Sequence, residues 1–233
     1  MVNKLFIVLV MLISSLCFAQ SGLEAYKEKN YEKAFKLYEK EAKNGNTTSQ
    51  NALSYLYFNG IGVEKNSEKA LKWLQKSAHN MNSRAQYDLA MMYLQGHNVK
   101  QDLKLAFTWL DSASDLENAD AQYNLALMYY RGTTVDTNVT KAADLLEKSA
   151  IGGNTQALQN VGRIYMQLIK FDKAAQWLEI NAQNGDVASY YLLAEIYCSQ
   201  EKFKIAKKWT KKSMDVGNRD AQLLWNKYNL EKY

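Results

Sequence analysis

Apolar side chains recur in short segments of this chain with the spacing of a single helix face. In residues 85–93 they stand at i, i+4, i+7 and i+8, as Ala85, Leu89, Met92 and Tyr93. In residues 106–113 they stand at i, i+3, i+4 and i+7, as Ala106, Trp109, Leu110 and Ala113. Both spacings are typical of amphipathic helices. The pattern predicts two successive helices, called helix A and helix B, joined by a loop around Gly96.

This helical pair is repeated with a period of 36 residues. Three kinds of position keep the period: an aliphatic residue of helix A, a tyrosine near its end and an alanine of helix B. They are Leu53, Leu89, Leu125 and Val161; Tyr57, Tyr93, Tyr129 and Tyr165; and Ala70, Ala106 and Ala142. After Tyr165 the step falls to 32, as in Tyr165 to Tyr197 and Trp177 to Trp209. A solenoid tolerates such a loop deletion, because each unit contacts only its neighbours.

The period predicts an all-α protein made of stacked helix pairs. We expect N-terminal capping helices, three long repeats, two shortened repeats and a C-terminal capping helix. These span residues 20–47, then 48–82, 83–118 and 119–154, then 155–186 and 187–218, and finally 219–233.

Polar residues mark where the helices should begin, and aromatic residues mark the expected core. Asn66, Asp102 and Asn138 stand at the start of helix B, where a side chain accepts a hydrogen bond from a helix amide. Asn154, Asp186 and Asn218 stand before helix A, each after a glycine that can end helix B in the left-handed conformation. We expect the recurrent tryptophans of helix B to be buried between layers; they are Trp73, Trp109, Trp177 and Trp209.

These residues together resemble the Sel-1-like repeat (SLR) family, which is related to tetratricopeptide repeats. Residues 83–118 carry most of the motif, and residues 48–82 hold its Gly-x-Gly-Val loop as Gly60, Ile61, Gly62 and Val63. The resemblance implies a right-handed α/α superhelix whose concave surface is lined by helix A. It also implies a scaffold or adaptor for other proteins, with exported bacterial members. The chain departs from the motif at Asn98 and Thr134, which replace the second loop glycine.

The N-terminus predicts export. Lys4 is followed by an apolar run from Leu5 to Leu16 and by a small-x-Ala end at Ala19, which is the pattern of a cleavable signal peptide over residues 1–19. The run is too short to span a bilayer comfortably. We therefore expect a periplasmic or secreted protein that does not span the membrane. The alternative is a lipid-modified Cys17, although Leu16 is larger than that processing prefers.

Charge and cysteine content narrow the functions further. Loss of Lys4 would lower the formal net charge from +5 to +4, and acids and bases are interspersed along the chain. Nucleic-acid binders carry a clustered basic stripe instead, so we expect no nucleic-acid partner. Cys198 would be the only cysteine after cleavage. It is a small buried apolar residue, a reactive thiol, or a thiol that pairs between chains.

Helical phase predicts a binding face on helix A, opposite the stripe that faces the stack. Large apolar residues stand there in place of polar ones, and such residues are favoured at protein interfaces. They are Tyr55, Phe58, Tyr87, Met91, Leu94, Tyr123, Leu127 and Tyr130, with Tyr191 in the last repeat. Gln159, Arg163 and Glu195 make the last two copies more polar. The alternative is that this face packs on a neighbouring helix.

Candidates for catalysis are few. His79 and His97 fall between predicted helices without metal-ligand spacing, so we expect solvated loop residues and neither a metal nor a cofactor. Ser199 and Lys202 match the S-x-x-K motif of penicillin-binding enzymes and β-lactamases, in a shortened loop without the accompanying motifs. Lys207, Lys208, Lys211 and Lys212 surround Trp209, either as a solvated face or as a contact for peptidoglycan, a phospholipid surface or an acidic protein.

The sequence thus favours a monomeric, non-enzymatic scaffold of the bacterial cell envelope that holds a protein or peptide. Two alternatives stay open. One is a weak penicillin-binding or β-lactamase-like cell-wall hydrolase, and the other is a secreted factor that acts on a host protein.

Overall fold

The computed structural model describes residues 22–233. The predicted signal peptide, its cleavage after Ala19 and the alternative modification of Cys17 lie outside these residues. Within the described range the regular structure is helical, and no strand occurs there.

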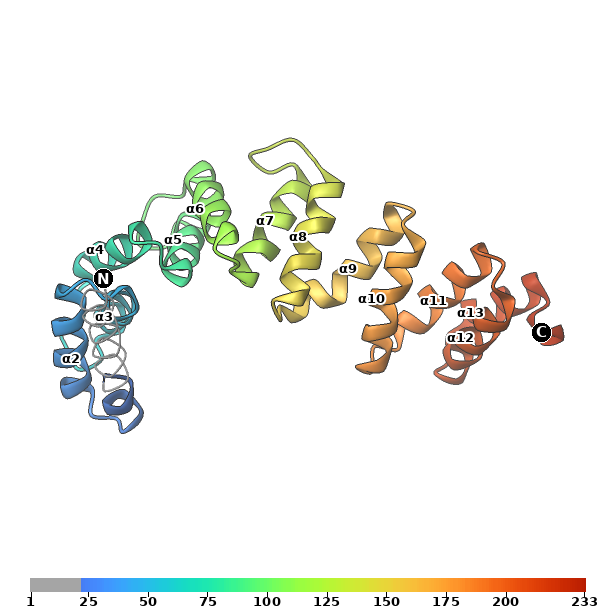
Figure 1. The fold of residues 1–233 in the computed structure, drawn as a ribbon, viewed down its shortest axis with the longest axis horizontal. Helices are drawn as coiled ribbons and strands as arrows, with labels where there is room; N and C mark the ends of the chain where they lie inside the picture. Colours follow the sequence, from blue (N-terminus) through green and yellow to red (C-terminus); the bar gives the residue numbers. More distant parts are fainter. Residues whose placement is uncertain (1–21) are drawn as a thin grey trace, which may run out of the picture. The chain divides into compact units, whose positions relative to one another are not determined.

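The helices follow one another in pairs, as Figure 1 shows. A helical segment over residues 22–27 precedes the first of the longer helices. The positions of helix A are taken by α3 (Thr47–Asn59), α5 (Ser83–Gln95), α7 (Ala119–Arg131), α9 (Thr155–Gln167), α11 (Ala188–Ser199) and α13 (Arg219–Tyr228). Those of helix B are taken by α2 (Tyr31–Lys43), α4 (Ser67–His79), α6 (Leu103–Asp115), α8 (Val139–Ile151), α10 (Phe171–Gln183) and α12 (Phe203–Asp215). A short 3-10 helix, η1 (Leu230–Lys232), follows α13.

The chain divides into two compact units, Met1–Gln122 and Tyr123–Tyr233. In the first unit, α2 contacts α3, α3 contacts α4, α4 contacts α5 and α5 contacts α6. In the second unit, α8 to α13 contact one another in the same consecutive manner, and η1 packs on α12 and α13. Each unit is an all-α stack of helix pairs, which confirms the predicted fold class.

The predicted helix starts are largely confirmed. The side chains of Asn66, Asp102 and Asn138 accept hydrogen bonds from amides of α4, α6 and α8. Asn154 caps α9 in the same way, and Asn218 caps α13. Asp186 also accepts from the amide of Ala188, at 3.2 Å, although α11 begins one residue later than that cap position would place it.

Small residues of helix B let neighbouring helices approach closely. Ala70, Ala106 and Ala142 of helix B have no exposed surface.

The tryptophan prediction was wrong for three copies: Trp73, Trp109 and Trp177 are only partly buried, and Trp209 alone is buried. The leucine that follows each of these three tryptophans is buried instead, as Leu74, Leu110 and Leu178. Trp73 and Trp109 still pack, as partly buried side chains, against the buried clusters around Leu53 and Leu89.

Buried glutamines connect helix A to the preceding helix B in the first unit. The side-chain amide of Gln50 donates to the carbonyl oxygen of Ala42 at 3.1 Å, and that of Gln86 donates to Ala78 at 3.1 Å. Gln122 repeats the contact with Ser114 at 3.4 Å. These carbonyls lie near helix ends, where backbone oxygens have no partner within the helix. The glutamines keep the 36-residue period, so this column was visible in the sequence.

Two periodic tyrosines of the second unit hydrogen-bond to a carboxylate of the preceding helix B. The hydroxyl of Tyr165 donates to Glu147 at 2.7 Å, and that of Tyr197 donates to Glu179 at 2.8 Å. Lys173 and Trp177 also donate to Glu147, at 2.8 and 3.1 Å. Burial alone would raise the pKa of Glu147, but these three hydrogen bonds together hold that pKa below its ordinary value.

The loop between helix A and helix B has left-handed residues at two positions: the glycine that follows helix A and the residue two further on. Gly62 has a φ of 69°, and a Cβ there would collide with the backbone carbonyl of Tyr31 in α2. Asn98 and Thr134, which replace this glycine in the next two copies, keep the same conformation, with φ of 59° and 72°. The motif departures therefore leave the loop geometry intact. Thr134 does so at a steric cost, because β-branched residues rarely adopt positive φ.

These loops yield a stability prediction. Gly62→Ala should lower the free energy of unfolding by about 1–3 kcal/mol, because it adds both a strained φ and a backbone collision. Thr134→Gly at the matching position should raise that free energy by up to about 1 kcal/mol, since release of strain outweighs the added freedom of the unfolded chain. Urea unfolding followed by circular dichroism measures both. Equal changes in the free energy of unfolding for Gly62→Ala and Thr134→Gly would contradict the conclusion that this loop position requires a left-handed residue.

Candidate functional site

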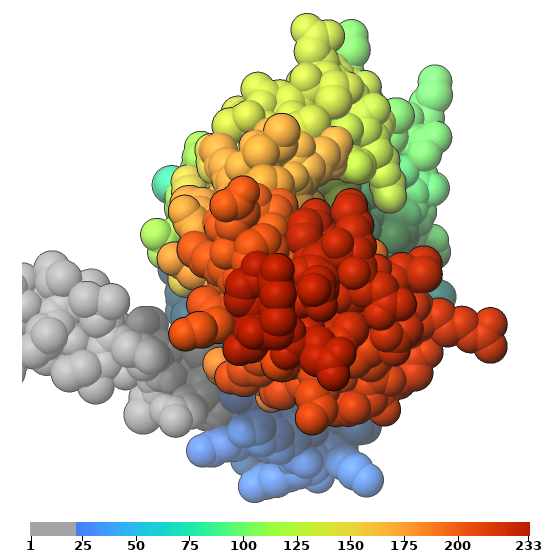
Figure 2. Space-filling view, turned by 90° about the vertical axis from the view of Figure 1, so that its right-hand side faces the viewer, coloured from blue at the N-terminus to red at the C-terminus, as the bar shows by residue number. Residues whose placement is uncertain are grey.

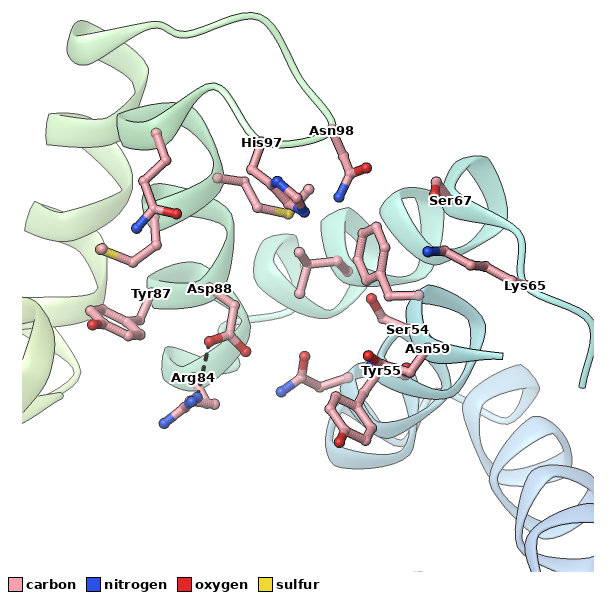
Figure 3. Close-up of a pocket in the computed structure, with 16 residues that line it drawn as sticks. Ser54, Tyr55, Asn59, Lys65, Ser67, Arg84, Tyr87, Asp88, His97 and Asn98 are labelled. Carbon is pink, nitrogen blue, oxygen red and sulfur yellow. Dashed lines mark hydrogen bonds and ion pairs between the residues drawn. The ribbon is translucent and has the colours of Figure 1, made fainter. Parts of the chain in front are cut away.

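A groove of about 640 Å³ lies between α3 and α5 in the first unit. Its floor includes Leu74 of α4, and its ends are formed by the loops that follow α3 and α5. Figure 3 shows Tyr55 on one wall and Tyr87 with Asp88 on the other, with His97 and Asn98 above them. Four of the nine predicted binding residues line this groove: Tyr55, Phe58, Tyr87 and Met91.

The apolar part of the groove is unevenly exposed. Tyr55 is 53% exposed, so its ring is available to a ligand. Tyr87 and Met91 are half-buried on the opposite wall. Phe58 is also half-buried and packs against the core around Leu53 and against that around Leu89. Both interpretations of this face, a binding surface and a packing surface, therefore hold in part. Phe58 belongs in part to the core between helices, and Tyr55 lies at the surface.

An ion pair that the sequence analysis missed stands in the same groove. Arg84 Nε donates to Asp88 Oδ1 at 3.0 Å, and the Arg84 guanidinium lies 5.6 Å from the centre of the Tyr87 ring. Burial raises the pKa of Asp88 above its ordinary value, although Arg84 and a hydrogen bond from Asn51 oppose this. The i, i+4 spacing of opposite charges on a predicted helix was the signal that could have found the pair.

Polar groups surround the apolar wall at the loop ends of the groove. They are Asn59, Lys65, Gln95, His97 and Asn98. His97 is exposed and lies in the loop after α5, as predicted, but it also borders the groove. A cleft with an apolar wall and a few polar groups at its edge is the usual form of a binding site in a protein surface.

Two hollows of the second unit are lined by residues that the sequence singled out. One, of about 260 Å³, lies between α7 and α9 and includes the predicted residues Leu127 and Tyr130. The other, of about 570 Å³, is lined mainly by polar residues of α9 and α10 and by the turn after α10, with Gln159 and Arg163 among them. Arg163 donates to the carbonyl oxygen of Gln159 at 2.9 Å. The more polar surface expected for the fourth copy is therefore present.

The other three predicted residues are half-buried side chains of helix A positions. Leu94 lies near the end of α5, and its carbonyl oxygen accepts from Gln101 at 2.8 Å. Tyr123 lies on α7. For Tyr191 on α11, burial and a hydrogen bond with Glu195 raise the pKa of the phenol to about 12. Its hydroxyl is therefore engaged within its own helix.

The S-x-x-K match does not form a loop site. Ser199 is the last residue of α11, where a shortened loop was expected, and its hydroxyl donates to the carbonyl oxygen of Ile196 at 2.7 Å. The ammonium of Lys202 lies 3.7 Å from a carboxylate oxygen of Asp172. The Ser199 side chain therefore bonds within its own helix, and the Lys202 side chain pairs with α10 rather than with Ser199.

One histidine was also misplaced by the sequence analysis. His79 ends α4 rather than lying in a loop, and its ring meets that of Trp109 edge-on at 5.2 Å. Its Nδ1 lies 2.7 Å from the carbonyl oxygen of Gln75. Within residues 22–233 no group of three or more His, Cys, Asp or Glu side chains could hold a metal ion.

Cys198 is a buried residue of α11 with 2% of its surface exposed, and no disulfide involves it in the described residues. Burial raises the pKa of the Cys198 thiol to about 11, with a contribution from Glu195. Since the thiolate is the nucleophile, this environment makes the thiol inert. It supports the interpretation of Cys198 as a small apolar core residue.

The burial of Cys198 yields a reactivity prediction. At pH 8 the native thiol should react with 5,5′-dithiobis(2-nitrobenzoate) at least about 100-fold more slowly than after denaturation, because each pKa unit removes a factor of ten in thiolate. Ser199→Cys in a Cys198→Ala background is the matched control, since residue 199 is exposed. The control should react at the rate of the unfolded chain. Equal rates for the two native thiols would contradict the assignment.

Fold and surface together define an α-helical repeat protein of the solenoid class. A family model described as Sel1 repeat matches residues 18–46, 47–80, 83–118 and 119–154, so the chain belongs to the Sel1 repeat family. The first match covers most of the segment that the sequence analysis interprets as capping helices. Sel1 repeats are helical scaffolds that typically mediate protein interactions.

Solved structures show the same relationship. A Sel1 repeat protein from Oxalobacter formigenes is 28% identical, with a TM-score of 0.70 and 87% of each chain covered. The protein c5321, a protective antigen present in uropathogenic Escherichia coli strains with an SLR fold, is 28% identical with a TM-score of 0.64. That alignment covers 89% of this chain and 47% of c5321. The pilF protein of Pseudomonas aeruginosa shares the fold at 17% identity, with a TM-score of 0.51 and coverage of 93% and 97%.

No curated protein matches the chain. In the described part of the chain, no helix has both the length and the apolar character needed to cross a membrane.

Proposed function

We propose that this protein is a non-enzymatic scaffold of the bacterial cell envelope that binds an extended protein segment in the groove between α3 and α5. The observation that carries the proposal is the exposed ring of Tyr55, which faces the half-buried Tyr87 and Met91 across an open volume of about 640 Å³. Aromatic and methionine side chains are enriched at protein interfaces, where they supply contact area at a small cost in conformational entropy.

The polar edge of the groove suits a peptide backbone. A bound segment would place an apolar side chain between Tyr55 and Tyr87 and its amides and carbonyls near the amide side chains of Asn98 and Gln95. The donors and acceptors of an extended backbone require such partners when water is displaced. An interface with an apolar centre and a polar rim is the ordinary anatomy of protein recognition.

Asp88 supports a binding role for the same wall. The Asp88 carboxylate loses solvation because it lies in the groove. Its ion pair with Arg84 does not fully offset this loss, since the pKa of Asp88 is raised. Perturbed carboxylates in clefts are more common at functional sites than elsewhere on a surface. With Arg84 beside it, Asp88 can bind a polar group that flanks the apolar anchor of a ligand.

The groove proposal predicts a loss of binding without a loss of fold. Peptides selected from a random phage-displayed library on the wild-type protein should bind Tyr55→Ser and Tyr87→Ser variants at least about tenfold more weakly, because an aromatic anchor is worth on the order of 2 kcal/mol. Isothermal titration calorimetry measures the affinity, and thermal unfolding checks the fold. Met81→Ser, which changes an apolar side chain of 67% exposure outside the groove, is the control.

Two outcomes would contradict the groove proposal. A large drop in the melting temperature of both tyrosine variants would show that the rings serve the core. Peptides that bind the tyrosine variants and the wild type equally would place the binding surface elsewhere on the molecule.

We also propose that the protein is exported and processed near Ala19. The support is the Lys4, apolar and small-x-Ala pattern of residues 1–19, together with the 28% identity to a protein described as a protective antigen. A secreted factor that acts on a host protein is the second candidate, favoured by the same similarity.

Export predicts a shortened chain outside the cytoplasm. Mass spectrometry of the protein from fractionated cells should find an N-terminus near Gln20 in the periplasm or medium. Recovery in the periplasm supports the envelope scaffold, and recovery in the medium supports the secreted factor. An intact Met1 in the cytoplasm would contradict both.

A further inference from the structure

The helix α12 carries charge unlike the other helices of its kind in the second unit. It holds five lysines and one acid, Asp215. By contrast, α8 has two lysines and two acids, and α10 has one lysine and two acids. Four of the α12 lysines are exposed and stand within eight residues of one another: Lys204, Lys208, Lys211 and Lys212. They are called the basic face below.

The basic face lies opposite the buried side of α12. Ala206, Trp209, Thr210 and Ser213 are buried against the neighbouring helices. Spacings of four, seven and eight residues from Lys204 put the four lysines on one side of the helix. Figure 2 shows that the residues of α12, α13 and η1 form the surface at this end of the second unit. Lys207 is set apart from the basic face, since its ammonium donates to the carbonyl oxygen of Glu231 at 2.7 Å.

The ammonium groups of the basic face have no acidic partner in the described chain. No ion pair within residues 22–233 includes Lys204, Lys208, Lys211 or Lys212. Residues 1–21 contain no aspartate or glutamate that could supply one. Like charges four residues apart destabilise a helix, as in Lys204 with Lys208 and Lys208 with Lys212. No ion pair of the described chain offsets this repulsion.

Aromatic rings hold two of these lysines in place. Lys208 lies 5.5 Å and Lys212 4.8 Å from the centre of the Trp209 ring, and Lys212 lies 5.5 Å from that of Tyr190. Cation–π contacts of this kind restrict the ammonium groups without neutralising them. The two ammonium groups therefore keep their charge and stay exposed to solvent, while the rings limit their movement.

We propose that the basic face of α12 is a docking surface for an acidic segment of a partner protein. From Lys204 to Lys212 the helix rises about 12 Å, which an extended segment of about four residues spans. Carboxylates spaced along such a segment can each meet one ammonium group. Lysine is a compact point charge suited to single carboxylates, and α12 has no arginine, whose planar fork fits phosphate groups best.

The same features disfavour other anionic partners. Helices that bind membrane surfaces place large apolar side chains beside their lysines. Of the large apolar residues of α12 only Ile205 is exposed, at 41%, and Trp209 is buried. Single-stranded nucleic acid needs exposed rings for base stacking, and the Trp209 ring is covered.

Fluorescence anisotropy with a fluorescein-labelled octaglutamate peptide at low salt tests the proposal. A variant with Lys208→Gln, Lys211→Gln and Lys212→Gln should bind the peptide at least about tenfold more weakly than the wild type. The control has Lys69→Gln, Lys72→Gln and Lys76→Gln on α4, which removes the same charge and likewise two ring-stacked lysines. Its affinity should change by less than about twofold. Circular dichroism should show both variants folded, with the melting temperature of the α12 variant not lowered.

Two results would overturn the proposal. Equal loss in the α12 and α4 variants would show that the peptide senses only net charge. Tighter binding of the wild type to phosphatidylglycerol vesicles than to octaglutamate, abolished in the α12 variant, would assign the face to a lipid surface instead.

Discussion

The close packing of each helix on the next is the interaction on which the whole structure depends. A single helix pair cannot cover its own apolar face, so each pair is stable only when a neighbour supplies the other side of the core. Fully buried alanines of helix B, such as Ala70 and Ala106, allow the backbones to approach. Leucines such as Leu89 and Leu110 then fill the remaining space.

This packing also decides where polar groups are used inside the protein. Gln50 and Gln86 bridge successive helices by donating to backbone carbonyls at helix ends. Tyr165 and Tyr197 bridge helices in the second unit through Glu147 and Glu179. Buried polar groups are costly unless they are paired, so each bond fixes one arrangement of neighbouring helices. These hydrogen bonds therefore select one packing arrangement for the stacked helices.

The candidate binding surfaces are the positions that the packing leaves uncovered. The groove between α3 and α5 is lined at one point by Leu74 of α4; Tyr55 in this groove is exposed, while Phe58 still contacts the core. The basic face of α12 lies on the exposed side of its helix, opposite the buried residues. The two surfaces differ in chemistry because the packing constrains only the buried stripe, and the outward positions can vary from one copy to the next.

The sequence by itself determined the helices, their order and their caps. The 36-residue columns identify which residues face the stack, and Asn66, Asp102 and Asn138 mark helix starts, because periodicity and capping are local properties of the chain. The same columns indicated four residues of the groove. They did not show that Phe58 is partly core, that Trp109 is only partly buried, or that Arg84 and Asp88 form a pair inside the groove. Those facts depend on how far apart neighbouring helices lie and on which side chain fills each gap, and only the tertiary structure decides them.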